Sequence, residues 1–147
     1  MSLLSPADQE KLRESFDEMT NSVRVLFFTQ TLDGEHCVQT RQILDELPAL
    51  SDKIAIEEVN FILEKDTAAQ YGIDRVPALA LLSQDAAGDA HDTRIRFLGA
   101  PGGYGFVSLV QALMLAGGRE SGLTPNNRQR IAAVNTPTTI QVFSTPT

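Results

Sequence analysis

The segment of residues 23–29 constrains the fold of this chain more than any other feature of the sequence. It is written Val-Arg-Val-Leu-Phe-Phe-Thr, rich in β-branched and aromatic residues and almost continuously apolar after Arg24. A strand of this kind is buried on both faces, as in sheets that are covered by helices. We therefore expect residues 23–29 to form a central strand of such a sheet.

Helical and strand patterns alternate on both sides of this strand. Upstream, Ser5 and Pro6 place a cap residue before a proline at the first helical position, and apolar residues follow at helical spacing through Met19. Downstream, the expected elements are a helix from residue 38, a strand over 54–61, a short helix over 67–71 and a strand over 78–82. The order is αβαβαβ.

The next region predicts a hairpin and a long helix. Residues 94–98 alternate strictly between polar and apolar side chains, which is typical of a strand with one wet face near a sheet edge. The turn-rich residues 85–89 connect it to the preceding strand. Gly102-Gly103 opens a helix that ends at Gly117-Gly118. Together these elements predict an α/β fold with a mixed central sheet flanked by helices.

Beyond the long helix the pattern restarts. Thr124-Pro125 caps another helix, expected to run to Val134, and residues 139–143 are strand-like. When residues 139–147 are set beside residues 23–31, one phenylalanine and two threonines coincide. We interpret this region as the opening helix and strand of a second copy of the same unit. The alternative is a C-terminal strand whose similarity is accidental.

Charge and composition argue against several classes of function. The 147 residues carry a formal net charge of −7 without a basic cluster, and such a chain repels nucleic acids and anionic membranes. No apolar run approaches the ~20 residues that span a bilayer, and no signal-peptide pattern opens the chain, so a cytoplasmic location is expected. Cys37 is the single cysteine, so the chain has no intramolecular disulfide. With His36 and His91 it makes three candidate ligands, too few for a structural zinc site. We expect no metal and no other cofactor.

Four stretches of the sequence carry a resemblance to a known family. They are Gly34-Glu35-His36-Cys37, residues 71–78 (Tyr-Gly-Ile-Asp-Arg-Val-Pro-Ala), residues 96–103 (Arg-Phe-Leu-Gly-Ala-Pro-Gly-Gly) and residues 142–147 (Val-Phe-Ser-Thr-Pro-Thr). They resemble the glutaredoxin-like protein disulfide oxidoreductases, chains of two tandem thioredoxin-fold units that are related to the N-terminal domain of the alkyl hydroperoxide reductase flavoprotein. The resemblance implies a thioredoxin-like unit over residues 5–119. Residues 120–147 would then be a linker and the start of a truncated second unit, whose Cys-x-x-Cys follows the threonine-proline-threonine ending in the family.

The resemblance also implies where the chemistry lies. Cys37, expected at a helix N-terminus where N–H groups and the helix dipole stabilise a thiolate, matches the family's nucleophile. Where better-equipped members carry Cys-x-x-Cys, this chain has Thr40 in place of the second thiol, and its hydroxyl is expected to donate to the Cys37 thiolate. The alternative for Cys37 is a small buried apolar residue. Pro77 is expected to follow a cis bond and to face Cys37, the alternative being a trans proline that opens a strand.

Two functions are consistent with this site. The first is a supporting or vestigial unit of a thiol-disulfide oxidoreductase with little dithiol activity alone, because no second thiol resolves a mixed disulfide on Cys37. The alternative is an active monothiol, glutaredoxin-like exchange enzyme in which Cys37 attacks and an external thiol resolves. In monothiol glutaredoxins a Gly-Gly pair is followed closely by an acidic residue that holds glutathione. Gly102-Gly103 has no such neighbour and also fits simple backbone freedom before a helix.

The expected partners are protein thiols or disulfides, in a thioredoxin-reductase-like or peroxiredoxin system. Residues 138–144 alternate in character, and an unpaired strand of this kind invites association. We expect this segment to pair with another element, either the sheet of the first unit or a second chain in a homodimer.

Overall fold

The computed structural model describes residues 2–32 and 34–145. The elements are, in chain order, α1 (Pro6–Asp17), β1 (Ser22–Thr29), α2 (Glu35–Asp45), β2 (Ile54–Asn60), α3 (Lys65–Gln70), β3 (Ala78–Gln84), β4 (Ala90–Leu98), α4 (Tyr104–Ala116) and α5 (Pro125–Ala132). All helices and strands expected between residues 5 and 118 are therefore present. Among the described residues, no helix has the length and apolar character needed to cross a membrane.

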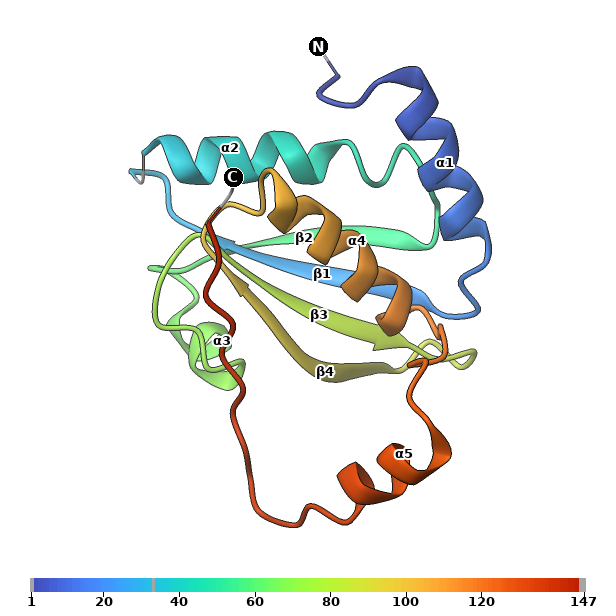
Figure 1. The fold of residues 1–147 in the computed structure, drawn as a ribbon. Helices are drawn as coiled ribbons and strands as arrows, with labels where there is room; N and C mark the ends of the chain where they lie inside the picture. The colour runs from blue at the N-terminus through green and yellow to red at the C-terminus, as the bar shows by residue number, and fades with distance from the viewer. Residues whose placement is uncertain (1, 33, 146–147) are drawn as a thin grey trace.

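The strands form one mixed sheet in the order β2-β1-β3-β4. β1 is parallel to β2 and antiparallel to β3, and β3 is antiparallel to β4. β1 is thus an inner strand and β4 an edge strand, as their sequence patterns predict. The expected mixed sheet with flanking helices is confirmed (Figure 1).

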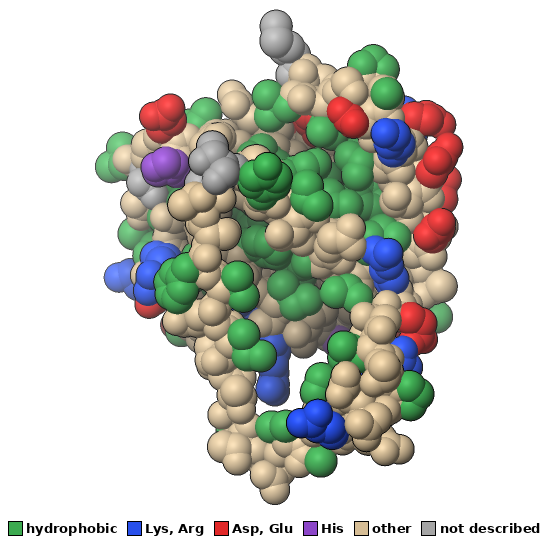
Figure 2. Space-filling model, viewed as in Figure 1, with side chains coloured by type: hydrophobic (Ala, Val, Ile, Leu, Met, Phe, Trp, Pro, Cys, Tyr) green, Lys and Arg blue, Asp and Glu red, His purple; other side chains and the backbone are tan. Residues whose placement is uncertain are grey.

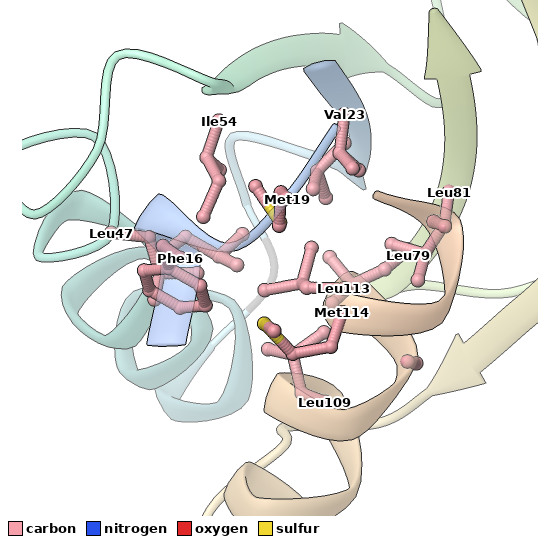
Figure 3. Close-up of a cluster of buried hydrophobic side chains, with 14 of the residues drawn as sticks. Phe16, Met19, Val23, Leu47, Ile54, Leu79, Leu81, Leu109, Leu113 and Met114 are labelled. Carbon is pink, nitrogen blue, oxygen red and sulfur yellow. The ribbon is translucent and has the colours of Figure 1, made fainter. Parts of the chain in front are cut away.

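Helices cover the two faces of the sheet unequally. The larger core lies between the sheet and α1, α2 and α4 (Figure 3); its fully buried members include Phe16, Val23, Val25, Leu44, Leu47, Leu79, Leu81, Leu109 and Leu113. The smaller core lies on the face of α3, where Ala68 packs with Leu26 and Phe28 of β1. Odd-numbered side chains of β1 therefore enter one core and even-numbered ones the other, which is why the strand is apolar throughout.

Local capping explains where α1 and α5 begin. The Ser5 hydroxyl oxygen accepts the N–H of Asp8 at 3.1 Å, and the Thr124 hydroxyl oxygen accepts the N–H of Asn127 at 3.3 Å. Each cap is followed by a proline, and the backbone angles agree closely: φ −66° and ψ 154° at residue 5, φ −63° and ψ 152° at residue 124. The two helices therefore begin with the same cap geometry.

α4 ends against the loop between α1 and β1. The Gly117 carbonyl oxygen accepts the N–H groups of Thr20 at 2.9 Å and Asn21 at 3.0 Å. Gly118 follows with φ +102°, and a Cβ at this position would collide with the Thr20 hydroxyl. Both the backbone conformation and the close approach therefore require glycine at residue 118.

A β-bulge interrupts β4. The pairing register of β3 and β4 shifts near the middle of the strands, where Arg94 has φ +66°. The Arg94 N–H donates to the Asp92 carboxylate at 2.8 Å, and the Thr93 hydroxyl donates to the Leu81 carbonyl oxygen at 2.7 Å. The bulge divides the outer edge of the sheet into two short stretches.

The predicted C-terminal strand is wrong. Residues 139–143 form no β-structure and join no sheet among the described residues. Their side chains Ile140, Val142 and Phe143 are 85%, 86% and 90% exposed. Alternation produces a strand only when a neighbouring strand supplies hydrogen bonds and a core covers the apolar face. In the described part of the chain, residues 139–143 have neither.

The region after α4 lies outside both cores. Every described residue from 118 to 145 is exposed, those of α5 included. In Figures 1 and 2 this region forms an arm that leaves the sheet, turns at α5 and returns past the sheet toward the start of α4. Residues 146 and 147 of the threonine-proline-threonine ending lie outside the described residues.

Candidate functional site

The residues singled out from the sequence lie at one end of the sheet. β1 ends there at Thr29, and α2 begins shortly afterwards at Glu35. β3 begins there at Ala78, which pairs with Phe28 and directly follows Pro77. Cys37 and Pro77 therefore belong to segments attached to the same end of two neighbouring strands.

Cys37 lies in the first turn of α2. Its N–H donates to the carbonyl oxygen of Gly34, which occupies the cap position of the helix. Only 4% of the residue is exposed. The structure thus combines the two alternatives for Cys37, because the residue has the helix-terminal position of a nucleophile and the burial of a core residue. The residue therefore offers little surface to an incoming disulfide.

Thr40 does not have the role expected for its hydroxyl. Its side chain is fully buried on the same face of α2 as Cys37, and Oγ1 donates to the His36 carbonyl oxygen at 2.7 Å. A hydroxyl has one hydrogen, so in this arrangement it is engaged with the backbone and not with the Cys37 thiolate. His36 itself is exposed in the first turn of α2.

Pro77 connects the site to the edge strand. The Val76–Pro77 peptide bond is cis, and the Pro77 carbonyl oxygen accepts the N–H of Gly99 at 2.9 Å. Gly99 directly follows β4 and begins the loop that leads to α4. This loop ends at Gly103, whose φ of +57° uses the backbone freedom of glycine before the helix starts.

Thr29 is a residue of this region that sequence reasoning missed. It is 3% exposed at the last position of β1, and its Oγ1 is a buried side-chain oxygen without a hydrogen-bond partner among the described residues. Because side chains alternate along a strand, Thr29 lies on the face of Phe27, the face that α2 covers. The sequence does show a polar residue at the end of an apolar strand. It does not show that the hydroxyl is buried without a hydrogen-bond partner.

Large apolar side chains surround the site on the surface. Leu32 follows β1 and is 97% exposed, Val38 follows Cys37, Leu98 ends β4, and Tyr104 begins α4. Leu98 pairs with Ala78, so the end of β4 and the start of α4 lie at the same end of the sheet as Cys37. Exposed apolar groups gathered from several segments are typical of a surface that binds polypeptides.

One ion pair lies near the start of α2. One turn beyond Cys37, Arg41 forms an ion pair with Glu58 at 2.7 Å and lies 5.9 Å from the centre of the Phe27 ring. Among residues 2–32 and 34–145, no three His, Cys, Asp or Glu side chains are grouped in a way that could hold a metal ion.

Comparisons with known proteins agree with this geometry. The sequence matches no protein-family model and no curated protein sequence. Among solved structures, the NTD_N/C domain of the alkylhydroperoxide reductase AhpF from Enterococcus faecalis is 29% identical with a TM-score of 0.78, over 88% of this chain and 60% of that one. A protein disulfide oxidoreductase from Aeropyrum pernix is 22% identical with a TM-score of 0.73, over 88% and 54%.

A single-unit protein also matches. Thioredoxin from Trichomonas vaginalis is 21% identical with a TM-score of 0.50, over 73% of this chain and 88% of that thioredoxin. The chain has a thioredoxin fold. The two kinds of protein that the sequence motifs resemble are both among its structural neighbours, so the predicted resemblance is confirmed. This thioredoxin-fold chain spans 60% of the AhpF domain and 54% of the oxidoreductase.

Proposed function

We propose that this chain is a supporting thioredoxin-fold unit of a thiol-disulfide oxidoreductase and does not complete a dithiol cycle alone. The observation that carries the proposal is the state of residue 40. Thr40 takes the place of the second thiol, is fully buried and has its hydroxyl engaged with the His36 carbonyl oxygen. When Cys37 attacks a disulfide, a mixed disulfide forms and one thiolate leaves. Release of the product then needs a second thiol, which the chain lacks.

The structural neighbours support protein thiols or disulfides as partners. One neighbour is a domain of an alkylhydroperoxide reductase and another a protein disulfide oxidoreductase. We place this unit in a cytoplasmic peroxiredoxin or thioredoxin-reductase-like system. Because the chain spans 60% or less of these two neighbours, a dithiol on a further unit fits the proposal as the working redox centre. The exposed residues 138–144 would pair with a strand of a partner, which includes a second copy of this chain in a homodimer.

One observation favours the alternative, an active monothiol exchange enzyme. Cys37 occupies the first turn of α2, and reactive cysteines are often found at helix N-termini. In that function Cys37 attacks, an external thiol such as glutathione resolves the mixed disulfide, and Pro77 shapes the site beside it. Cys37 is only 4% exposed, which counts against rapid attack of its thiol on a disulfide. We therefore rank this function second.

An insulin-reduction assay on three proteins separates the two functions. The unmodified chain should show no sustained turnover with a thioredoxin-reductase-type donor, because Thr40 supplies no resolving thiol. Thr40→Cys restores the motif and should produce turnover where the rest of the site is intact. Cys37→Ser in the unmodified chain is the matched control without the nucleophile.

Each result has a defined meaning. Turnover by the unmodified chain that disappears in Cys37→Ser establishes the monothiol enzyme and overturns the first proposal. Turnover that appears only with Thr40→Cys supports the first proposal. Inactivity of all three proteins shows that more than the second thiol is lost and that the unit acts as a scaffold.

A further inference from the structure

Arg96 of β4 contacts the start of loop 71–77, the loop that ends at Pro77 in the candidate site. Its Nε donates to the Tyr71 carbonyl oxygen at 3.0 Å. Its two terminal nitrogens donate to the two carboxylate oxygens of Asp92 at 2.8 and 2.7 Å. The guanidinium carbon also lies 5.6 Å from the centre of the Tyr71 ring. The planar group is thus fixed by a bidentate carboxylate, a carbonyl and an aromatic face.

Tyr71 is the residue at which α3 ends and the loop of residues 71–77 begins. Its N–H donates to the Thr67 carbonyl oxygen, and its ring packs at 6.2 Å from the ring of Phe28 in β1. Gly72, with φ +68°, then turns the chain away from the helix. Tyr71 is therefore the anchored start of the loop that carries Pro77 at its other end.

Both ends of this loop are tied to the same strand. At its start the Tyr71 carbonyl oxygen accepts from Arg96, and at its end the Pro77 carbonyl oxygen accepts from Gly99, the residue after β4. Between them Ile73 is buried, whereas Asp74 and Arg75 are exposed and pair with each other at 2.8 Å. That ion pair lies within the loop and does not attach it to the body.

We propose that Arg96 is a positioning residue for the thiol site, which clamps the start of loop 71–77 to β4 and so fixes the backbone before Pro77 for a polypeptide partner. The inference rests on the proposed function, in which that partner is a protein thiol or disulfide. The neighbouring guanidinium holds the pKa of the Asp92 carboxyl below its usual range, so the pair is charged on both sides at neutral pH. Lysine at residue 96 would keep the charge but lose the fork that serves two acceptors at once.

The test compares Arg96→Ala and Arg96→Lys with a matched control, Arg24→Ala. Arg24 also lies in a strand and pairs with a carboxylate, Glu57, at 2.8 Å, but it belongs to β1 and β2. The first measurement is amide hydrogen exchange within residues 72–76, read at Gly72 and Ile73, whose N–H groups donate to the carbonyl oxygens of Ala69 and Ala68. A lost hydrogen bond to a charged donor is worth ~1.5–3 kcal/mol, so exchange there should accelerate about tenfold or more in Arg96→Ala. Arg96→Lys should show most of this acceleration, and Arg24→Ala none.

The second measurement follows mixed-disulfide formation on Cys37 by mass spectrometry with two probes. Insulin presents a polypeptide disulfide, and 5,5′-dithiobis(2-nitrobenzoate) presents a small one; in each case the Cys37 thiolate bonds to one sulfur and the other leaves as a thiolate. Arg96→Ala should slow the reaction with insulin about tenfold and leave the small reagent unchanged. A purely structural role gives the opposite result, because general loosening exposes the buried Cys37 and accelerates both reactions.

The outcomes keep the two proposals apart. Unchanged exchange in residues 72–76 overturns the clamp, as does acceleration spread equally over β1 and the loop. If Arg96→Ala proves too unstable, Asp92→Asn replaces the carboxylate that accepts both terminal nitrogens of Arg96. Amide exchange in residues 72–76 should then accelerate by a smaller factor. A wild-type chain that never reacts with insulin contradicts disulfide exchange as its function, while the exchange measurement still decides the clamp.

Discussion

Thr29 and Thr40 are both buried threonines, but their hydroxyl groups differ in hydrogen bonding. Both side chains are at least 97% buried, but Thr40 donates to a carbonyl oxygen, whereas the Thr29 hydroxyl has no hydrogen-bond partner among the described residues. Burying a polar group without a partner costs about 1–3 kcal/mol by mutational measurements. The end of β1 beside the site is therefore less stable than an apolar residue would make it.

We predict that Thr29→Val raises the free energy of unfolding by about 1–2 kcal/mol, because a methyl replaces an unsatisfied hydroxyl of similar shape. Thr40→Val is the matched control and should lower it by about 1 kcal/mol, since it removes a hydrogen bond that is made. Urea unfolding followed by circular dichroism measures both. A destabilised Thr29→Val would show that this hydroxyl has a partner in solution.

At this scale the sequence predicts positions better than contacts. Helical spacing places Cys37 in the first turn of α2, as expected, but nothing in the sequence predicts that Cys37 and Thr40 are both buried. The bond from Arg96 to Tyr71 joins residues 25 positions apart. It depends on which strand lies beside which helix end, and a single sequence does not contain that information.

At the scale of elements, the helices and strands of the first unit agree with prediction where local rules and burial act together. α5 forms where its cap is placed even though it buries no side chain, so a proline and a threonine cap define a helix start without tertiary support. Residues 139–143 fail as a strand because a strand has no internal hydrogen bonds. Helices satisfy their own backbone groups, and this difference explains which prediction was wrong.

The contact between α4 and the loop before β1 gives a second prediction. Gly118→Ala should lower the free energy of unfolding by about 1–3 kcal/mol, because alanine at φ +102° is strained and its Cβ meets the Thr20 hydroxyl. Gly105→Ala, inside α4, is the control. Its Cβ would meet nothing within 4 Å, and alanine in a helix should stabilise by up to about 1 kcal/mol.

Calorimetry on the two glycine variants provides the measurement. Opposite shifts of the melting temperature are expected, downward for Gly118→Ala and upward for Gly105→Ala. Equal shifts in one direction would mean that the loop at Thr20 relaxes freely and that α4 is not fixed at this end.

At the scale of the whole molecule, the buried residues of both cores lie before residue 118. All described residues from 118 to 145 are exposed, so their removal uncovers no core. We predict that a chain ending at residue 119 unfolds with the same free energy as the full chain to within about 0.5 kcal/mol. Phe16→Ala, which empties a fully buried site of the larger core, should cost about 3–5 kcal/mol in the same urea experiment. A shortened chain that loses more than 1 kcal/mol would place part of the core in the arm.

The same shortened chain tests the proposed homodimer. Sedimentation of the full chain should show a dimer that becomes a monomer once residues 120–147 are removed. A full chain that stays monomeric at all concentrations contradicts pairing of residues 138–144 with a second copy.

The bulge at Arg94 sets how far any pairing along β4 can spread. An open sheet edge is a template on which further chains polymerise when it is long and flat. Here the register shift leaves residues 90–92 on one side and residues 96–98 on the other, each too short to hold a stable ladder alone. A growing cross-β fibre needs a continuous run of about six residues. The bulge at Arg94 interrupts β4, so the strand has no such run. The edge therefore offers a partner two short stretches and not the continuous run that a fibril needs.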